Sequence, residues 1–264
     1  MVKWLKYLVF VLVMSSVVEA QAQNIDSLKL DLKNAKHDTT RCNILNELAE
    51  TASEEEWPGY NEQLLKLAEK SAATAPTNTL KEFYFKHLSD ALNNIGFLAR
   101  QQGDIPKALE FYHKSLKIRE EIMDKMGIAN SLINIGAIYR NQGEPTKALE
   151  FYHKSLKIQE EIMDKIGIAY SLNNIGVIYL NQGNIPKALE FYYKSLKIRE
   201  EIMDKEGIAG SLNNIGVIYD SQGDIPKALE FYHKSLKIQE EIMDKKGIAN
   251  SLINIGAIYR NQGE

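Results

Sequence analysis

Cysteine is nearly absent from this sequence, since Cys42 is the only one among 264 residues. An intramolecular disulfide is therefore impossible, and packing must supply the stability of the fold. Cys42 lies in an apolar helical pattern with Leu45, which favours a buried structural thiol over a reactive one. Helix breakers are also few, with six Pro and 16 Gly, and the many Leu, Ile and Tyr residues argue against extended disorder.

An excess of basic charge is missing as well. The formal net charge is −3, and Lys and Arg are interleaved with slightly more Asp and Glu. A nucleic-acid-binding surface would require a basic patch or stripe. We therefore expect no nucleic-acid partner for this region.

The apolar run near the N-terminus is short. It covers Tyr7 to Val18, 12 residues, whereas a membrane-crossing helix needs about 20. Two lysines stand beside the run and small residues follow it, a pattern typical of a secretory signal. We predict a signal peptide over residues 1–22, cleaved after Ala22 or, alternatively, after Ala20. The signal peptide predicts an exported chain, periplasmic or extracytoplasmic. Because no Cys follows either site, we expect no lipid at the new N-terminus.

The most informative pattern is an internal repeat with a period of 40 residues. The repeat units cover residues 87–126, 127–166, 167–206 and 207–246, followed by a partial unit at 247–264 that is identical to 127–144. Residues 23–86 keep a weaker helical pattern and are predicted to form a degenerate N-terminal repeat or cap. Because the sequence stops after the first helix of its last unit, we interpret it as a fragment of a longer protein.

Each repeat unit predicts two helices, here called helix A and helix B. In the unit 127–166, helix A carries one apolar face, ends at Gly143, and has Ile128, Leu132, Ile135 and Tyr139 on that face. Helix B starts near Pro145, where a missing N–H costs nothing. We expect it to run to about Asp164, with an inner face made of Ala148, Tyr152, Ser155, Ile162 and Met163.

These residues resemble the tetratricopeptide repeat. The family pattern of large apolar, Leu-Gly, aromatic, Ala, aromatic and small residues is matched by Leu132, Ile135-Gly136, Tyr139, Ala148, Tyr152 and Ser155. The resemblance implies an all-α fold, a right-handed superhelical solenoid of antiparallel helix pairs, in a longer-helix variant. It also suggests the extracytoplasmic repeat region of bacterial tetratricopeptide signalling proteins.

No catalytic site is predicted. The histidines His113, His153 and His233 recur at repeat multiples on the polar face of helix B, so successive copies lie a whole repeat apart. The sequence contains neither a Gly-rich phosphate loop nor Cys and His residues at metal-ligand spacing. We therefore expect no enzyme activity, no metal and no cofactor.

Differences between the copied units are concentrated on helix A. They fall on one stripe, which is predicted to lie nearly opposite the inward face and consists of Asn130, Tyr170, Gly210; Ile133, Asn173, Asn213; Ala137, Val177, Val217; and Arg140, Leu180, Asp220. The resemblance implies that helix A lines a concave groove, so the stripe is a candidate for partner recognition. The alternative is drift at the least-packed positions.

An asparagine recurs beside this stripe, once in each unit. The series is Asn94, Asn134, Asn174, Asn214 and Asn254. A side-chain amide both donates and accepts, so such a ladder could pair with the backbone of an extended peptide, as the resemblance implies. The alternative is that these side chains cap or bridge neighbouring helices.

Two functions remain open from the sequence. The first is a non-catalytic scaffold that binds an extended peptide or protein segment in the groove. The second is the extracytoplasmic sensing region of a bacterial kinase, cyclase or transcriptional regulator, with any membrane segment and output domain beyond Glu264. We further expect that the final helix A, without a helix B to cover it, favours self-association or frays.

Overall fold

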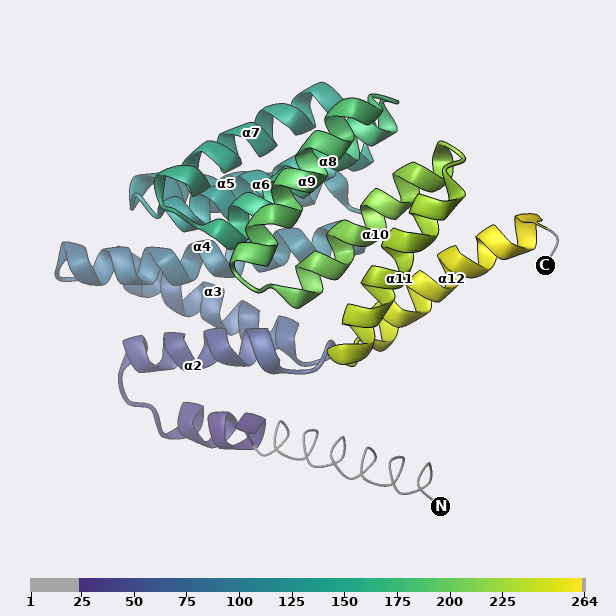
Figure 1. Ribbon diagram of the computed structural model, residues 1–264. Helices are drawn as coiled ribbons and strands as arrows, with labels where there is room; N and C mark the ends of the chain where they lie inside the picture. The colour runs from purple at the N-terminus through teal and green to yellow at the C-terminus, as the bar shows by residue number, and fades with distance from the viewer. Residues whose placement is uncertain (1–23, 263–264) are drawn as a thin grey trace, which may run out of the picture. The chain divides into compact units, whose positions relative to one another are not determined.

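The computed structural model describes residues 24–262, and these residues form helices joined by short turns, with no strand among them. Within residues 24–124 and within residues 125–262, consecutive helices run antiparallel and side by side (Figure 1). The predicted all-α fold of antiparallel helix pairs is thereby confirmed. The predicted signal peptide lies outside the described residues. The chain divides into an N-terminal region, residues 1–124, and a C-terminal region, residues 125–264.

In the N-terminal region a helical stretch over residues 24–34 precedes four longer helices. These are α2 (Asp38–Thr51), α3 (Trp57–Ala73), α4 (Asn78–Gln101) and α5 (Ile105–Glu121). Helix α4 begins well before residue 87, because Thr77 caps it by accepting a hydrogen bond from the Leu80 N–H at 3.2 Å.

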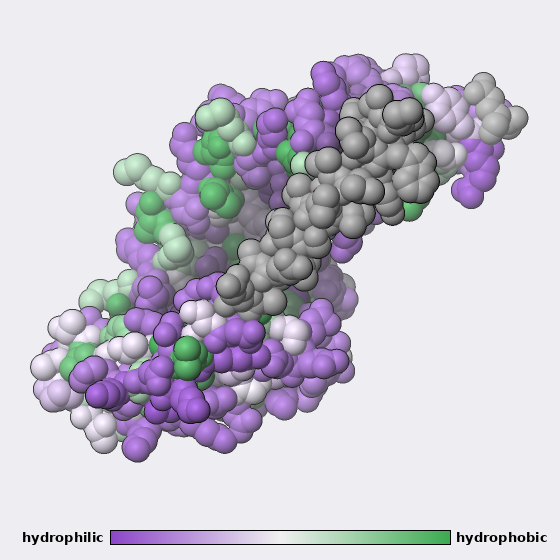
Figure 2. Space-filling view, turned by 90° about the horizontal axis from the view of Figure 1, so that it is seen from below, coloured by the Kyte–Doolittle hydropathy of each residue, from purple (hydrophilic) through white to green (hydrophobic). Residues whose placement is uncertain are grey.

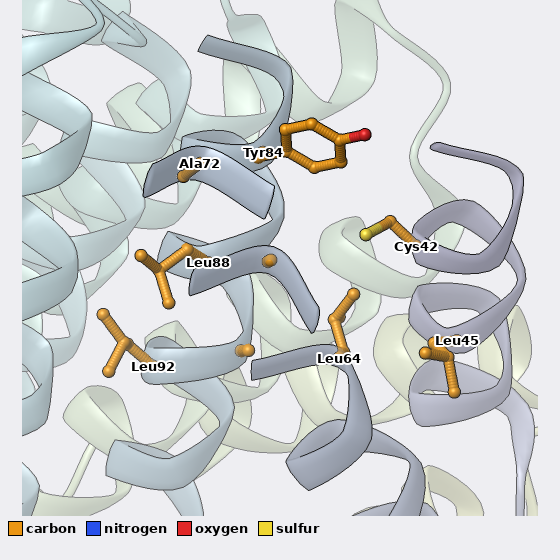
Figure 3. Close-up of a cluster of buried hydrophobic side chains, with 9 residues drawn as sticks. Cys42, Leu45, Leu64, Ala72, Tyr84, Leu88 and Leu92 are labelled. Carbon is orange, nitrogen blue, oxygen red and sulfur yellow. The ribbon is translucent and has the colours of Figure 1, made fainter. Parts of the chain in front are cut away.

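The core of the N-terminal region confirms the prediction for Cys42. Its thiol is fully buried among apolar side chains of α2, α3 and α4, including Leu45, Leu64 and Tyr84 (Figure 3). Burial raises the pKa of the Cys42 thiol to about 12, and the nearby Asp38 carboxylate acts in the same direction. The thiolate needed for nucleophilic chemistry is therefore disfavoured.

The C-terminal region repeats one helix pair. Its helices are α6 (Lys125–Asn141), α7 (Pro145–Glu161), α8 (Lys165–Asn181), α9 (Ile185–Glu201), α10 (Lys205–Ser221), α11 (Ile225–Glu241) and α12 (Lys245–Gln262). Each helix packs on the next along the chain. The even-numbered helices are helix A of their units and the odd-numbered ones are helix B.

Within a pair, small residues allow the two helices to approach closely. A Cβ added at Gly136 of α6 would lie 3.0 Å from the Tyr152 ring of α7, so only glycine fits there without movement. The Ser155 hydroxyl donates to the Ala129 carbonyl at 3.0 Å, and both residues are buried. The same hydroxyl-to-carbonyl bond recurs from Ser195 and in the last complete pair, so packing inside each pair is copied.

Between pairs, helix A of one unit rests on helix B of the unit before it. Leu172 and Ile175 of α8 share a buried cluster with Tyr152 of α7. The Ser171 hydroxyl of α8 donates to Gln159 of α7 at 2.7 Å, and both side chains are buried. Each later unit of the C-terminal region therefore uses its predecessor as one wall of its core.

The turn after helix B differs from the expectation. Helix α7 ends at Glu161 rather than near Asp164, and Met163 is not on an inner face but 84% exposed, with a left-handed φ of 55°. The Asp164 N–H returns to the Gln159 carbonyl at 2.9 Å, a helix-closing bond that requires this conformation. The Asp164 carboxylate then accepts from the Gly167 N–H and starts α8.

Candidate binding surface

The positions of the variable stripe on helix A range from exposed to buried. Asn130 and Gly210 are exposed, and the Tyr170 side chain is 49% exposed at the same place in its repeat. One turn further, Ile133 is buried whereas Asn173 and Asn213 are partly buried. The stripe therefore combines solvent-facing positions with positions that contact neighbouring helices.

The C-terminal end of the stripe takes part in packing. Val177 and Leu180 of α8 pack against the buried cluster formed by α9 and α10. Arg140 and Asp220 are partly buried at the places equivalent to Leu180. Val177 and Leu180 are therefore not among the least-packed positions, to which the drift alternative applies.

The asparagines that recur once per repeat form hydrogen bonds between neighbouring units. The Asn214 amide donates to the Asn173 carbonyl oxygen at 2.9 Å, and the Asn254 amide donates to that of Asn213 at 3.0 Å. These contacts join helix A of one unit to helix A of the next. They correspond to the bridging role that the sequence left open.

The remaining asparagines of the series lie in different surroundings. Asn174 is buried, and its amide donates to the Tyr170 carbonyl of its own helix at 3.1 Å. Asn134 is partly buried. In the N-terminal region, the Asn94 amide donates to Asn61 at 3.0 Å. An amide has two donors and two acceptor positions, so one bridging bond leaves capacity for a partner.

Charge changes along the surface at one position of the repeat, from Arg140 through Leu180 to Asp220. The Arg140 guanidinium donates to the Asn174 carbonyl oxygen at 3.0 Å, which fixes its place on the surface. Burial raises the pKa of the Tyr192 hydroxyl to about 12, and the positive charge of Arg140 opposes that rise. The helix A surface thus carries a positive side chain at Arg140 and a negative one at Asp220.

A cavity of about 310 Å³ opens at Gly210, between α10 and α12. It is lined by Glu206, Gly210, Asn213, Asn214, Gln239, Asp244, Lys246, Gly247 and Asn250. A Cβ added at Gly210 would meet nothing within 4 Å, so the missing side chain leaves open space. Where Tyr170 fills the surface in one repeat, Gly210 makes a polar pocket in the next.

Two lining residues of this pocket were missed by the sequence argument. Glu206 and Lys246 occupy a repeat position that reads Met126 and Ile166 in the earlier units. All four are exposed and lie one helical turn before the position of Gly210. The variable stripe therefore extends one turn further toward the N-terminus of helix A, and comparison of the units at this position could have shown it.

A second, smaller cavity of about 220 Å³ lies beside Arg140, at the junction of α6, α7 and α8. Its lining includes Pro145 and Asn181. On helix B, by contrast, His153 and His233 are exposed, as is the equivalent His113 of the N-terminal region. The candidate surface thus lies on helix A, and the separated histidines stay on the opposite helix of each pair.

The described part of the chain presents few other chemical features. Within residues 24–262 no group of three or more His, Cys, Asp or Glu side chains is placed to hold a metal ion. A helix of the length and apolarity needed to cross the bilayer is not found there either. On the face seen in Figure 2, hydrophilic residues predominate and hydrophobic residues form small separate patches.

The repeated pairs, shared core walls and helix A surface define a helical-repeat array, a class whose extended surfaces typically bind other proteins. A tetratricopeptide repeat model matches residues 87–161, 127–201, 167–241 and 207–264. The chain therefore belongs to the tetratricopeptide repeat family, which is typically a non-catalytic interaction scaffold. No curated protein matches the sequence.

Solved structures share this fold at low sequence identity. BtubC (BKLC) from P. vanneervenii is 22% identical with a TM-score of 0.66, covering 79% of this chain and 84% of that one. A signal transduction ATPase with numerous domains and a tetratricopeptide repeat sensor, from Pyrococcus horikoshii, is 20% identical with a TM-score of 0.68; 95% of this chain aligns with 38% of that chain. A Rap protein complexed with competence and sporulation factor is 15% identical with a TM-score of 0.58, covering 94% and 73%.

Proposed function

We propose that this protein is a non-catalytic scaffold that binds an extended segment of another protein along the helix A surface of α6 to α12. The observation that carries the proposal is the placement of the differences between nearly identical repeats. The outermost positions, which include Tyr170, Gly210 and Lys246, vary and face solvent. Helix B and the packing inside each pair stay almost unchanged.

The groups on the helix A surface indicate what kind of segment it can bind. Amides such as Asn214 can pair with the backbone of an extended segment without reading its sequence. Tyr170 offers an exposed ring for apolar or stacking contact. The pocket at Gly210 accepts one side chain among polar groups, and the charges of Arg140 and Asp220 favour a segment with an acidic residue at one end and a basic residue at the other.

An exchange of side chains between repeats tests this proposal. Peptides that bind the chain would first be selected from a displayed random library, and their affinities measured by calorimetry. Gly210→Tyr fills the pocket with the residue that the preceding repeat carries. We expect this variant to weaken binding by roughly tenfold or more, because the partner side chain loses its site.

A matched control is available on helix B. His153→Tyr copies the residue that stands at Tyr193 in the next repeat, so the array already tolerates it. This variant should leave the affinity unchanged. Equal losses in both variants, or no loss in Gly210→Tyr, would contradict a binding surface on helix A.

A second candidate function is the extracytoplasmic sensing region of a signal-transduction protein. The predicted signal peptide favours it, and repeats described as a sensor occur in the structurally similar ATPase from Pyrococcus horikoshii. The two candidates share the binding surface. They differ in that the sensing function requires an output domain coupled to the repeats, whereas the scaffold function requires none.

A further inference from the structure

The pocket at Gly210 has an equivalent one repeat earlier, at the junction of α8, α9 and α10. Arg199 of α9 stands there at the place of Gln239, which lines the pocket from α11. Asp204 precedes α10 just as Asp244 precedes α12. The two junctions are thus built alike and differ in a few side chains.

In the earlier junction the chain supplies its own guanidinium. The Arg199 side chain is only 14% exposed, and its Nη1 donates to Asp204 Oδ2 at 3.1 Å. Its Nε donates to the Ser195 hydroxyl at 3.2 Å. The guanidinium lies against Gly207, where an added Cβ would overlap it. The carboxylate that starts α10 therefore has a charged partner from the preceding helix B.

In the pocket at Gly210 this guanidinium is missing. The glutamine side chain stops before the carbon and the two terminal nitrogens of a guanidinium. Gln239 is buried and neutral, and its carbonyl oxygen accepts from the Ser251 hydroxyl at 2.7 Å. The space that Arg199 fills in one repeat thus belongs to an open cavity of about 310 Å³ in the next.

The carboxylate beside this cavity keeps the same orientation without the charged partner. Asp244 Oδ1 accepts from the Gly247 N–H at 3.0 Å, and Asp204 Oδ1 accepts from Gly207 at the same distance. Among residues 24–262, no Lys, Arg or His side chain forms an ion pair with Asp244, whereas Asp204 is paired with Arg199. Asp244 thus offers a free carboxylate oxygen at the place where its counterpart holds a guanidinium.

The charges that line the pocket leave one negative charge in excess. Glu206 and Asp244 contribute two carboxylates, and Lys246 contributes one ammonium group. The amides of Asn213 and Asn250 add polar atoms to the lining. A cationic side chain would balance the pocket, whereas an acidic one would meet two carboxylates for a single ammonium.

We propose that the pocket at Gly210 binds the guanidinium of an arginine carried by the bound segment. This inference rests on the proposed function, because it names the side chain that the helix A surface selects at this point. The arginine takes the part that Arg199 takes in the earlier junction. Its planar group has five N–H donors, so it can pair with the Asp244 carboxylate and with amide oxygens together. A lysine has the same charge but lacks this fixed fork.

The test compares the peptides that two forms of the full chain select from a displayed random library. The wild type should enrich peptides with arginine at one fixed position. Gln239→Arg copies the residue of the preceding repeat, so the array already tolerates it, and it supplies a guanidinium to Asp244 from within the chain. We expect this variant to lose the enrichment of arginine while still selecting peptides through the rest of the helix A surface.

Calorimetry with a peptide selected on the wild type measures the size of the effect. Citrulline in place of its arginine keeps the shape and removes the charge, and it should weaken binding roughly tenfold or more. Asp244→Asn should cause a similar loss for the arginine peptide and little further loss for the citrulline peptide. Asparagine still caps a helix, as Asn184 does at α9, so the fold should be kept.

The matched control is Asp164→Asn, the same change at the start of α8, which should leave the affinity unchanged. Peptides that lack an enriched arginine but lose affinity in Gly210→Tyr would overturn this inference and leave the proposed function standing. An enriched acidic residue at the pocket, or equal affinities of the arginine and citrulline peptides, would overturn it too. If no peptide is selected by either form, the proposed function fails and this inference fails with it.

Discussion

At the residue scale, the same side chain acts differently according to what covers it. Tyr152, Tyr192 and Tyr232 are fully buried and sit over a glycine of the paired helix. Tyr170, on the outer surface, is available to a partner. Burial raises the pKa of Tyr192 and of Tyr232 to about 12, because the charged phenolate would lose its hydration.

Alkali should therefore weaken the fold through Tyr192. Its folded pKa lies above the unfolded value of about 10, so its stabilising effect is complete below that pH and is lost as the pH rises toward 12. Tyr192→Phe removes the ionisable group while keeping the ring over Gly176. The difference in unfolding free energy between wild type and variant should shift by about 1 kcal/mol between about pH 9 and about pH 11, in favour of the variant.

Urea denaturation at the two pH values measures this shift. Ile175→Val, which changes a buried side chain without an ionisable group, serves as the control and should differ from the wild type by the same amount at both pH values. If the difference in unfolding free energy between wild type and Tyr192→Phe were the same at both pH values, burial would not raise the pKa of this hydroxyl.

At the element scale, glycine has two opposite uses within helix A. At Gly176 of α8, an added Cβ would lie 2.7 Å from the Tyr192 ring, so the position is reserved for close helix contact. At Gly210 of α10, the space is empty. Both glycines are helical, so the helix propensity of the residue does not distinguish them.

We expect Gly176→Ala and Gly210→Ala to change stability in opposite directions. Gly176→Ala should destabilise by about 1 to 3 kcal/mol, because the tyrosine ring must move. Gly210→Ala should stabilise by up to about 1 kcal/mol, since alanine favours the helix and meets no neighbour. Urea midpoints at constant m-value give both numbers, and shifts of the same sign would show that packing does not set the difference.

At the scale of the whole molecule, the C-terminal region is built from interfaces that are nearly copies of one another. If residues 167–206 were removed, α7 would be followed by α10. Ser211 would then stand where Ser171 donates to Gln159 at 2.7 Å. Stability in such arrays is approximately a sum over repeats and their nearest-neighbour interfaces.

A chain lacking residues 167–206 should thus fold and unfold cooperatively, with a lower melting temperature, because one repeat and one interface are lost. Thermal circular dichroism checks this. Removing only residues 167–196 deletes fewer residues but breaks the 40-residue register, and it should cost far more helicity. Equal behaviour of the two deletions would contradict nearest-neighbour packing.

The sequence by itself determined the helical repeat, its family and the burial of Cys42, because apolar periodicity and a fixed repeat length are local properties of the chain. It also pointed to helix A as the variable surface. It did not reveal the left-handed Met163, since the turn depends on backbone bonds that close helix B. The sequence likewise did not predict which side chains pair. Asn214 donates to Asn173 only because α10 stacks beside α8.

Tertiary structure alone decided how equivalent residues of the repeat are surrounded. Asn174 and Asn214 stand at the same place in their repeats, yet Asn174 accepts from Arg140 whereas Asn214 donates to Asn173. The pocket at Gly210 arises in the same way, from α10 and α12 meeting around a position without a side chain. Burial is a property of what lies nearby in space, and a repeated sequence cannot specify it copy by copy.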